Sequence, residues 1–115
     1  MPSDRDRRWL EDISENIAVV ETILSRADRE RFGRDIVLRY AVTYALLSIS
    51  EAVRRLSPEI KERHAGIDWR DVEDAGNAYR HEYHRLDVDM LWETATTELR
   101  ALKRIIGRAL GKRRR

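Results

Sequence analysis

The stretch that decides the fold runs from Arg34 to Leu56 and reads RDIVLRYAVTYALLSISEAVRRL. Apolar residues fall on nearly every side of a helix drawn through it, and the alternation typical of a half-buried strand is absent. A helix that is apolar all round is either covered by several neighbours or lies in an interface. The Ser57–Pro58 pair is predicted to end it, because the residue before a proline disfavours helical geometry.

An amphipathic helix is predicted before this stretch, from about Asp4 to Arg26. Its apolar residues repeat at spacings of three and four, which is typical of one buried face: Leu10, Ile13, Ile17, Val20 and Leu24. Segment 27–33 is predicted to be a polar, charged break in which Asp28 can act as an N-cap. Within the core we expect to find both Ile17 and Leu47.

Two further helices are predicted after a loop over residues 64–68. The third begins at Trp69 with Asp68 as its N-cap, and the fourth runs from Asp87 or Asp89 to Leu110. An all-α fold follows, an up-down four-helix bundle to which residues 59–63 could add a short extra helix. Because three amphipathic helices cannot cover one that is apolar all round, we expect a dimer.

The length of 115 residues is that of one ordinary domain. The chain has no cysteine. We assign residues 1–110 to a single helical domain and residues 111–115 to a basic C-terminal tail. The net charge is only +2, yet no acidic residue follows Glu98 while eight basic ones do. Such a run either holds nucleic acid or an acidic partner, or is simply solvated.

No membrane segment is predicted, because the longest apolar run, Ala41 to Ile49, is too short to cross a bilayer. The N-terminus is charged and no apolar signal segment follows it. We therefore expect a soluble, cytoplasmic protein without a membrane partner.

The candidate chemistry lies on the third helix. Four polar residues share one face at positions i, i+3, i+4 and i+7: Asn77, Arg80, His81 and His84. The opposite stripe suits packing: Trp69, Val72, Gly76, Tyr79 and Tyr83. A cationic, titratable face on a packed helix could bind and cleave a phosphodiester, or it could be an inert solvated face.

RNA cleavage without a metal needs two proton transfers and stabilisation of a negative phosphorane. Histidine suits the proton transfers because its pKa lies near neutrality, and arginine suits the charge because it forks onto phosphate oxygens. His81, Arg80 and Asn77 therefore make a candidate site. Glu51 is either an exposed position on its apolar helix or a carboxylate that orients Arg80 or His81.

Metal and cofactor sites are not predicted. His81 and His84 stand one residue closer than in the His-Glu-x-x-His zinc helix, and no third ligand is evident. The chain also has no glycine-rich phosphate loop and no Gly-x-Ser-x-Gly motif.

Four segments resemble the HepT-like branch of the HEPN superfamily, over the range from about Trp9 to Ile106: 49–57, 67–72, 77–83 and 88–92. The resemblance implies a small, dimeric helical protein that is the toxin partner of a minimal nucleotidyltransferase antitoxin. It also implies a metal-independent ribonuclease site at a cleft between protomers. The antitoxin would silence the toxin by transferring AMP to a tyrosine.

Residue by residue, the resemblance implies that His81 is the motif histidine, Asn77 the motif asparagine and Tyr83 the modified tyrosine. Glu51 matches the acid of the second helix. The motif arginine falls on Gly76, and Arg80 is its nearest replacement. Further RNA contacts are expected from four basic residues: His84, Arg85, Arg104 and Arg108.

Three functions remain open at this point. The first is a ribonuclease toxin that is active on RNA and silenced by AMP transfer. The second is a non-catalytic HEPN protein that binds and regulates a nucleotidyltransferase or a nucleotide, and Gly76 favours it. The third is a structural bundle whose polar face is inert.

Overall fold

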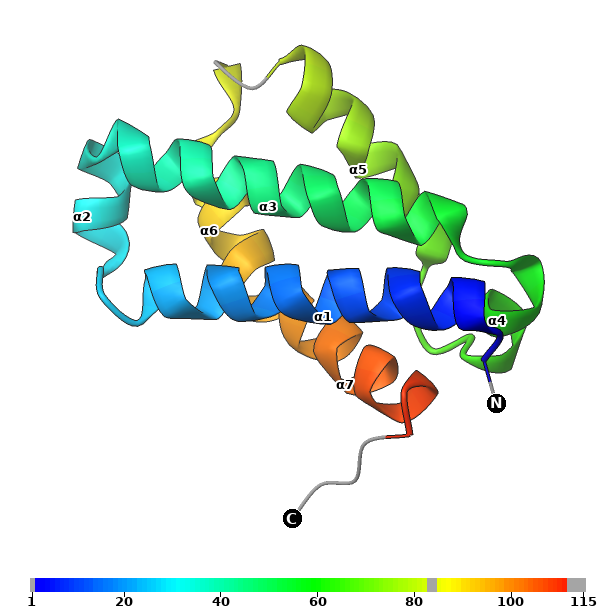
Figure 1. Cartoon of the computed structure of the whole chain (residues 1–115). Coiled ribbons are helices and arrows are strands. Elements are labelled where there is room, and N and C mark those ends of the chain that lie inside the picture. The colour runs from blue at the N-terminus through cyan, green and yellow to red at the C-terminus, as the bar shows by residue number, and fades with distance from the viewer. Residues whose placement is uncertain (1, 83–84, 112–115) are drawn as a thin grey trace.

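The described part of the chain, residues 2–82 and 85–111 of a computed structural model, is helical and contains no strand. The elements are α1 (Asp4–Leu24), α2 (Arg29–Arg34), α3 (Ile36–Arg55), α4 (Pro58–Arg63), α5 (Trp69–His81), α6 (Val88–Glu93), the π-helical turn η2 (Thr94–Glu98) and α7 (Leu99–Ala109). Figure 1 shows α1 and α3 side by side, with α5 on one flank and α7 on the other. The predicted all-α bundle is confirmed.

Side-chain caps place the helix starts where the sequence predicted them. The Asp28 carboxylate accepts from the Arg31 N–H of α2, and the Asp68 carboxylate accepts from the Asp71 N–H of α5. Ser57 caps α4, the short extra helix after Pro58. These caps satisfy backbone donors that have no partner within the helix.

The expected polar break at 27–33 is wrong, because this segment contains most of α2. Phe32 of α2 is fully buried, and its ring centroid lies 5.5 Å from that of Trp92. The buried Phe32 side chain therefore anchors an otherwise charged helix to the bundle. The fourth predicted helix is observed as α6, η2 and α7 in succession.

The buried face of α3 contains Leu46, whereas the prediction placed the neighbouring Leu47 in the core. Four residues spaced by four, three and four face inward and are at most 3 % exposed: Val42, Leu46, Ile49 and Val53. Leu47 is only half-buried, because adjacent helical residues point about 100° apart. Ile17 is 2 % exposed, as predicted.

Leu46→Ala is expected to lower the free energy of unfolding by about 2–5 kcal/mol, because it removes a buried side chain and leaves a cavity. Ile36→Ala is the matched control on the same helix and should cost clearly less, since Ile36 is 50 % exposed and lies outside the core. Chemical denaturation of both variants measures the difference. Equal losses would contradict this helical register.

α3 is the one helix among the described residues that is long and apolar enough to cross a membrane. The run Ala41–Ile49 underestimated this helix, which has 20 residues. In the window that meets this test, 44 % of the residues are buried inside the protein. The inner face of α3 contacts α1 and α5, as in the core helix of a helical domain.

Candidate functional site

The candidate site lies at the C-terminal end of α5, and the start of that helix is firmly anchored. The indole Nε1 of Trp69 donates to the carbonyl oxygens of His64 at 2.9 Å and Lys61 at 3.1 Å. Trp69, Gly76 and Tyr79 are buried on one face, as the predicted stripe requires. The opposite face therefore presents its polar side chains to solvent.

Glu51, Asn77 and Arg80 meet at the surface where α3 and α5 pack. One terminal nitrogen of Arg80 (Nη1) donates to Asn77 Oδ1 at 3.1 Å, and the other (Nη2) pairs with Glu51 Oε1. The side chains of Arg80 and Glu51 are 38 % and 37 % exposed. Exposed ion pairs contribute about 0–1 kcal/mol to stability, so this pair mainly fixes the direction of the guanidinium.

His81 is the last residue of α5 and is exposed. It stands four residues after Asn77, so Asn77 and His81 are neighbours on one face of the helix. Glu82 caps the helix, and its N–H donates to the Ala78 carbonyl. The helix α5 therefore ends at His81.

The other predicted site residues that the structure describes are all exposed: Arg85, Arg104 and Arg108. Tyr83 and His84 lie outside the described residues. Arg85 is exposed, and its N–H donates to the Glu82 carbonyl at 2.8 Å. Arg104 and Arg108 are exposed on α7, and Arg108 borders a pocket with Arg63 and His64 near the other end of α5.

The packing of α5 against α3 leaves no room for an arginine at position 76, where the chain has glycine. A Cβ atom built on Gly76 would lie 2.3 Å from Ser50 Oγ and 3.0 Å from Ser50 Cβ. Ser50 is 2 % exposed, and its hydroxyl lies within hydrogen-bond distance of the Val72 and Glu73 carbonyls, at 2.9 and 3.0 Å. Position 76 therefore faces α3, while Arg80, one turn later, reaches Glu51.

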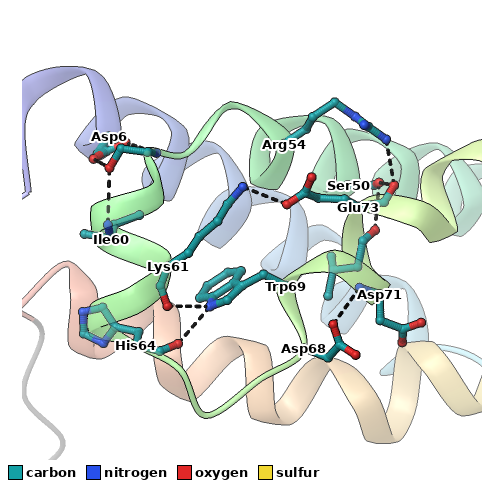
Figure 2. A network of polar contacts seen from close by, with 12 residues as sticks. Asp6, Ser50, Arg54, Ile60, Lys61, His64, Asp68, Trp69, Asp71 and Glu73 are labelled. Atoms are coloured by element: carbon teal, nitrogen blue, oxygen red, sulfur yellow. Dashed lines mark hydrogen bonds and ion pairs between the residues drawn. The ribbon is translucent and has the colours of Figure 1, made fainter.

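Further polar contacts hold α5 at this crossing, and Figure 2 shows them together. Arg54 of α3 donates to the Glu73 carbonyl at 3.0 Å. Lys61 of α4 pairs with the Glu73 carboxylate at 2.8 Å, and both side chains are largely buried. The contacts around Ser50 and Glu73 thus fix the position of α5 along α3, and with it the point where Arg80 meets Glu51.

A groove beside Arg80 was not predicted. It encloses about 250 Å³ between α3 and α5, lined by Tyr40, Thr43, Tyr44, Leu47, Tyr79 and Arg80. Burial, followed by the Glu98 carboxylate, raises the pKa of the Tyr79 hydroxyl to about 12. The signal available in the sequence is the i, i+4 spacing of Tyr40 and Tyr44.

Comparison with known proteins identifies the family. The model of the family described as "HepT-like: Ribonuclease HepT-like" matches residues 13–109. A Thermococcus cleftensis protein named "Probable ribonuclease HepT" is 33 % identical over 95 residues, 83 % of this chain and 86 % of that protein. A Caldanaerobacter subterraneus subsp. tengcongensis protein named "Putative RNase TTE0752" is 28 % identical over 106 residues, 92 % of this chain and 95 % of that protein. No solved structure matches the chain. The chain therefore belongs to the HepT-like ribonuclease family.

Proposed function

We propose that the protein is the ribonuclease toxin of a HEPN/nucleotidyltransferase toxin–antitoxin pair and cleaves RNA at the face that carries His81. Its family supports a ribonuclease function. The observation that carries the site assignment is that Asn77 and Glu51 hold Arg80, and that the next residue in the sequence is the exposed His81. In this proposal Arg80 is the nearest replacement for the motif arginine, whose position is occupied by Gly76.

In this mechanism His81 is the general acid or base. It takes the proton of the RNA 2′-hydroxyl or returns one to the leaving 5′-oxygen. Arg80 stabilises the charge that develops on the phosphorane oxygens. A guanidinium has five N–H donors, so the bonds to Asn77 and Glu51 leave others for phosphate. Asn77 and Glu51 act as orienting residues, and no metal ion takes part.

Further contacts with the RNA are proposed along the strand. Arg85 is exposed just after α5 and can hold a phosphate next to the cleaved one. His84, Arg104 and Arg108 remain proposed contacts for a longer RNA.

An apolar strip on α3 supports the proposed homodimer. It continues to Glu51 at spacings of three and four, like the seam of a coiled coil: Val37, Tyr40, Tyr44, Leu47 and Glu51. Val37 is 69 % and Tyr44 72 % exposed, which is uncommon for apolar side chains in a row. A twofold axis near the Glu51 end of this strip would bring two sites into one cleft.

Tyr44→Arg is expected to convert the dimer to a monomer at micromolar concentration, because it places a charge in the apolar strip. Light scattering should give twice the 13.6 kDa chain mass for the unaltered protein and one chain mass for the variant. Val19→Arg is the matched control, since Val19 is an exposed apolar residue on α1. A monomeric unaltered protein would contradict the proposal.

The partner proposed for this toxin is a minimal nucleotidyltransferase antitoxin that transfers AMP to Tyr83, in the cytoplasm. α5 ends at His81, and Tyr83 stands two residues later in the sequence. An AMP phosphate two residues from His81 would add negative charge beside Arg80 and occupy the place of the RNA phosphate.

Co-expression with the antitoxin is expected to add one or more AMP masses to the chain, and Tyr83→Phe should abolish the gain. Intact-mass spectrometry measures it. Tyr44→Phe is the matched control and should keep the mass gain, because it removes the same hydroxyl group from a tyrosine that is not the proposed acceptor. An AMP group mapped to another side chain would exclude this regulation.

The alternative is a non-catalytic HEPN protein that binds and regulates the nucleotidyltransferase or a nucleotide. Two observations favour it: glycine occupies the position of the motif arginine, and Glu51 already neutralises Arg80. A preparation that binds the antitoxin but shows no His81-dependent RNA cleavage would support this alternative.

A further inference from the structure

A second cationic site lies near the end of α5 that is remote from His81. Figure 1 shows the start of α1, the short helix α4 and the end of α7 meeting there. They enclose a pocket of about 220 Å³, lined by Arg7, Arg63, His64 and Arg108 above an apolar floor that includes Ile60 and Ala109. α5 spans about 20 Å, so this pocket is separate from the Glu51–Arg80 pair.

The charges in this pocket are not balanced by its own walls. None of the described residues that line it is acidic. Arg7 is 4.0 Å from Glu11, and the ion pairs found among the described residues include neither Arg63 nor Arg108. Burial, and then the charges of Arg63 and Arg108, lower the pKa of His64. The positive charges of Arg63 and Arg108 thus act on the His64 imidazole. A bound anion would reduce the repulsion between these positive groups.

We propose that this pocket binds the terminal phosphate of a nucleotide, with Arg63 and Arg108 on the phosphate oxygens. Arginine forks suit phosphate geometry. A terminal phosphate carries about −1.5 to −2 charges near neutral pH, which suits three arginines better than one carboxylate does. The apolar floor then takes the sugar or base. The nucleotide is either free or the 5′-phosphorylated end of an RNA strand, and the proposal does not rest on cleavage at His81.

The test uses four probes: AMP, adenosine, and a 2′-O-methyl RNA with either a 5′-phosphate or a 5′-hydroxyl end. The methyl groups remove the attacking hydroxyl, so cleavage cannot confuse binding. The reporter is the imidazole NMR signal of His64, assigned by its loss in His64→Gln. Phosphorylated probes should raise the pKa of His64, because a nearby anion favours the charged imidazole. The groups that face it from α1, α4 and α7 are all arginines.

Arg63→Gln/Arg108→Gln is expected to weaken binding of the phosphorylated probes by about tenfold or more, as loss of charge-assisted hydrogen bonds does. Arg26→Gln/Arg100→Gln is the matched control, because it removes the same charge at exposed positions outside the pocket. Binding of AMP but not of the phosphorylated RNA would identify a free nucleotide, and the reverse an RNA end. Equal binding of adenosine and AMP, equal losses in both double variants, or no binding of either phosphorylated probe would overturn the proposal.

Discussion

His81→Ala is expected to reduce RNA cleavage by about 10²–10⁴-fold, the range that general acid–base catalysis typically supplies. The physical reason is that alanine can neither accept the 2′-hydroxyl proton nor return one to the leaving oxygen. His81 is exposed at the last position of α5, so its truncation should leave the fold intact. The measurement is the initial cleavage rate on a defined RNA, with thermal unfolding of the same samples.

Glu82→Ala is the matched control for this variant, because Glu82 is the exposed neighbour and caps α5 through its backbone. It should keep its cleavage rate, and only His81→Ala should relieve growth arrest in cells. A chelator should leave the rate of the unaltered protein unchanged. Cleavage that survives His81→Ala, or that requires a metal, would exclude the proposed mechanism.

The helices could be predicted because periodicity and capping are local signals. Asp28 and Asp68 mark helix starts by residue type, and Pro58 marks the break after α3. The inner face of α3 could not be predicted, because a helix that is apolar all round has no preferred side. Only packing against α1 and α5 buries Leu46 and leaves Leu47 half-exposed.

One part of the candidate site could likewise be predicted from the sequence, and another part could not. The shared face of Asn77, Arg80 and His81 follows from helical spacing within α5. The contact of Glu51 with Arg80 was one of two predicted alternatives, because it depends on how α3 and α5 cross. The cationic pocket was missed because its residues come from α1, α4 and α7, which are far apart in sequence.

Position 76 offers the sharpest test of how this chain departs from the family motif. Gly76→Arg restores the motif arginine, yet we expect RNA cleavage to fall by about 100-fold or more instead of rising. Even a Cβ atom there would meet Ser50 at 2.3 Å, so the larger side chain must push α5 away from α3. Arg80 would then lose its alignment with Glu51, and displacements of about 1 Å can cost about 10²-fold in rate.

The same variant should also be less stable. Extra methylene groups in a packed core typically cost about 1–3 kcal/mol, and an arginine at this crossing should cost more. Gly107→Arg is the matched control, because a Cβ atom on Gly107 meets nothing within 4 Å, and arginine favours helix over glycine. Gly76→Ala should fall between the unaltered protein and Gly76→Arg. If Gly76→Arg instead cleaved RNA faster at unchanged stability, α5 would have to rotate to the motif's own geometry, and Arg80 would not be the residue that stabilises the phosphorane.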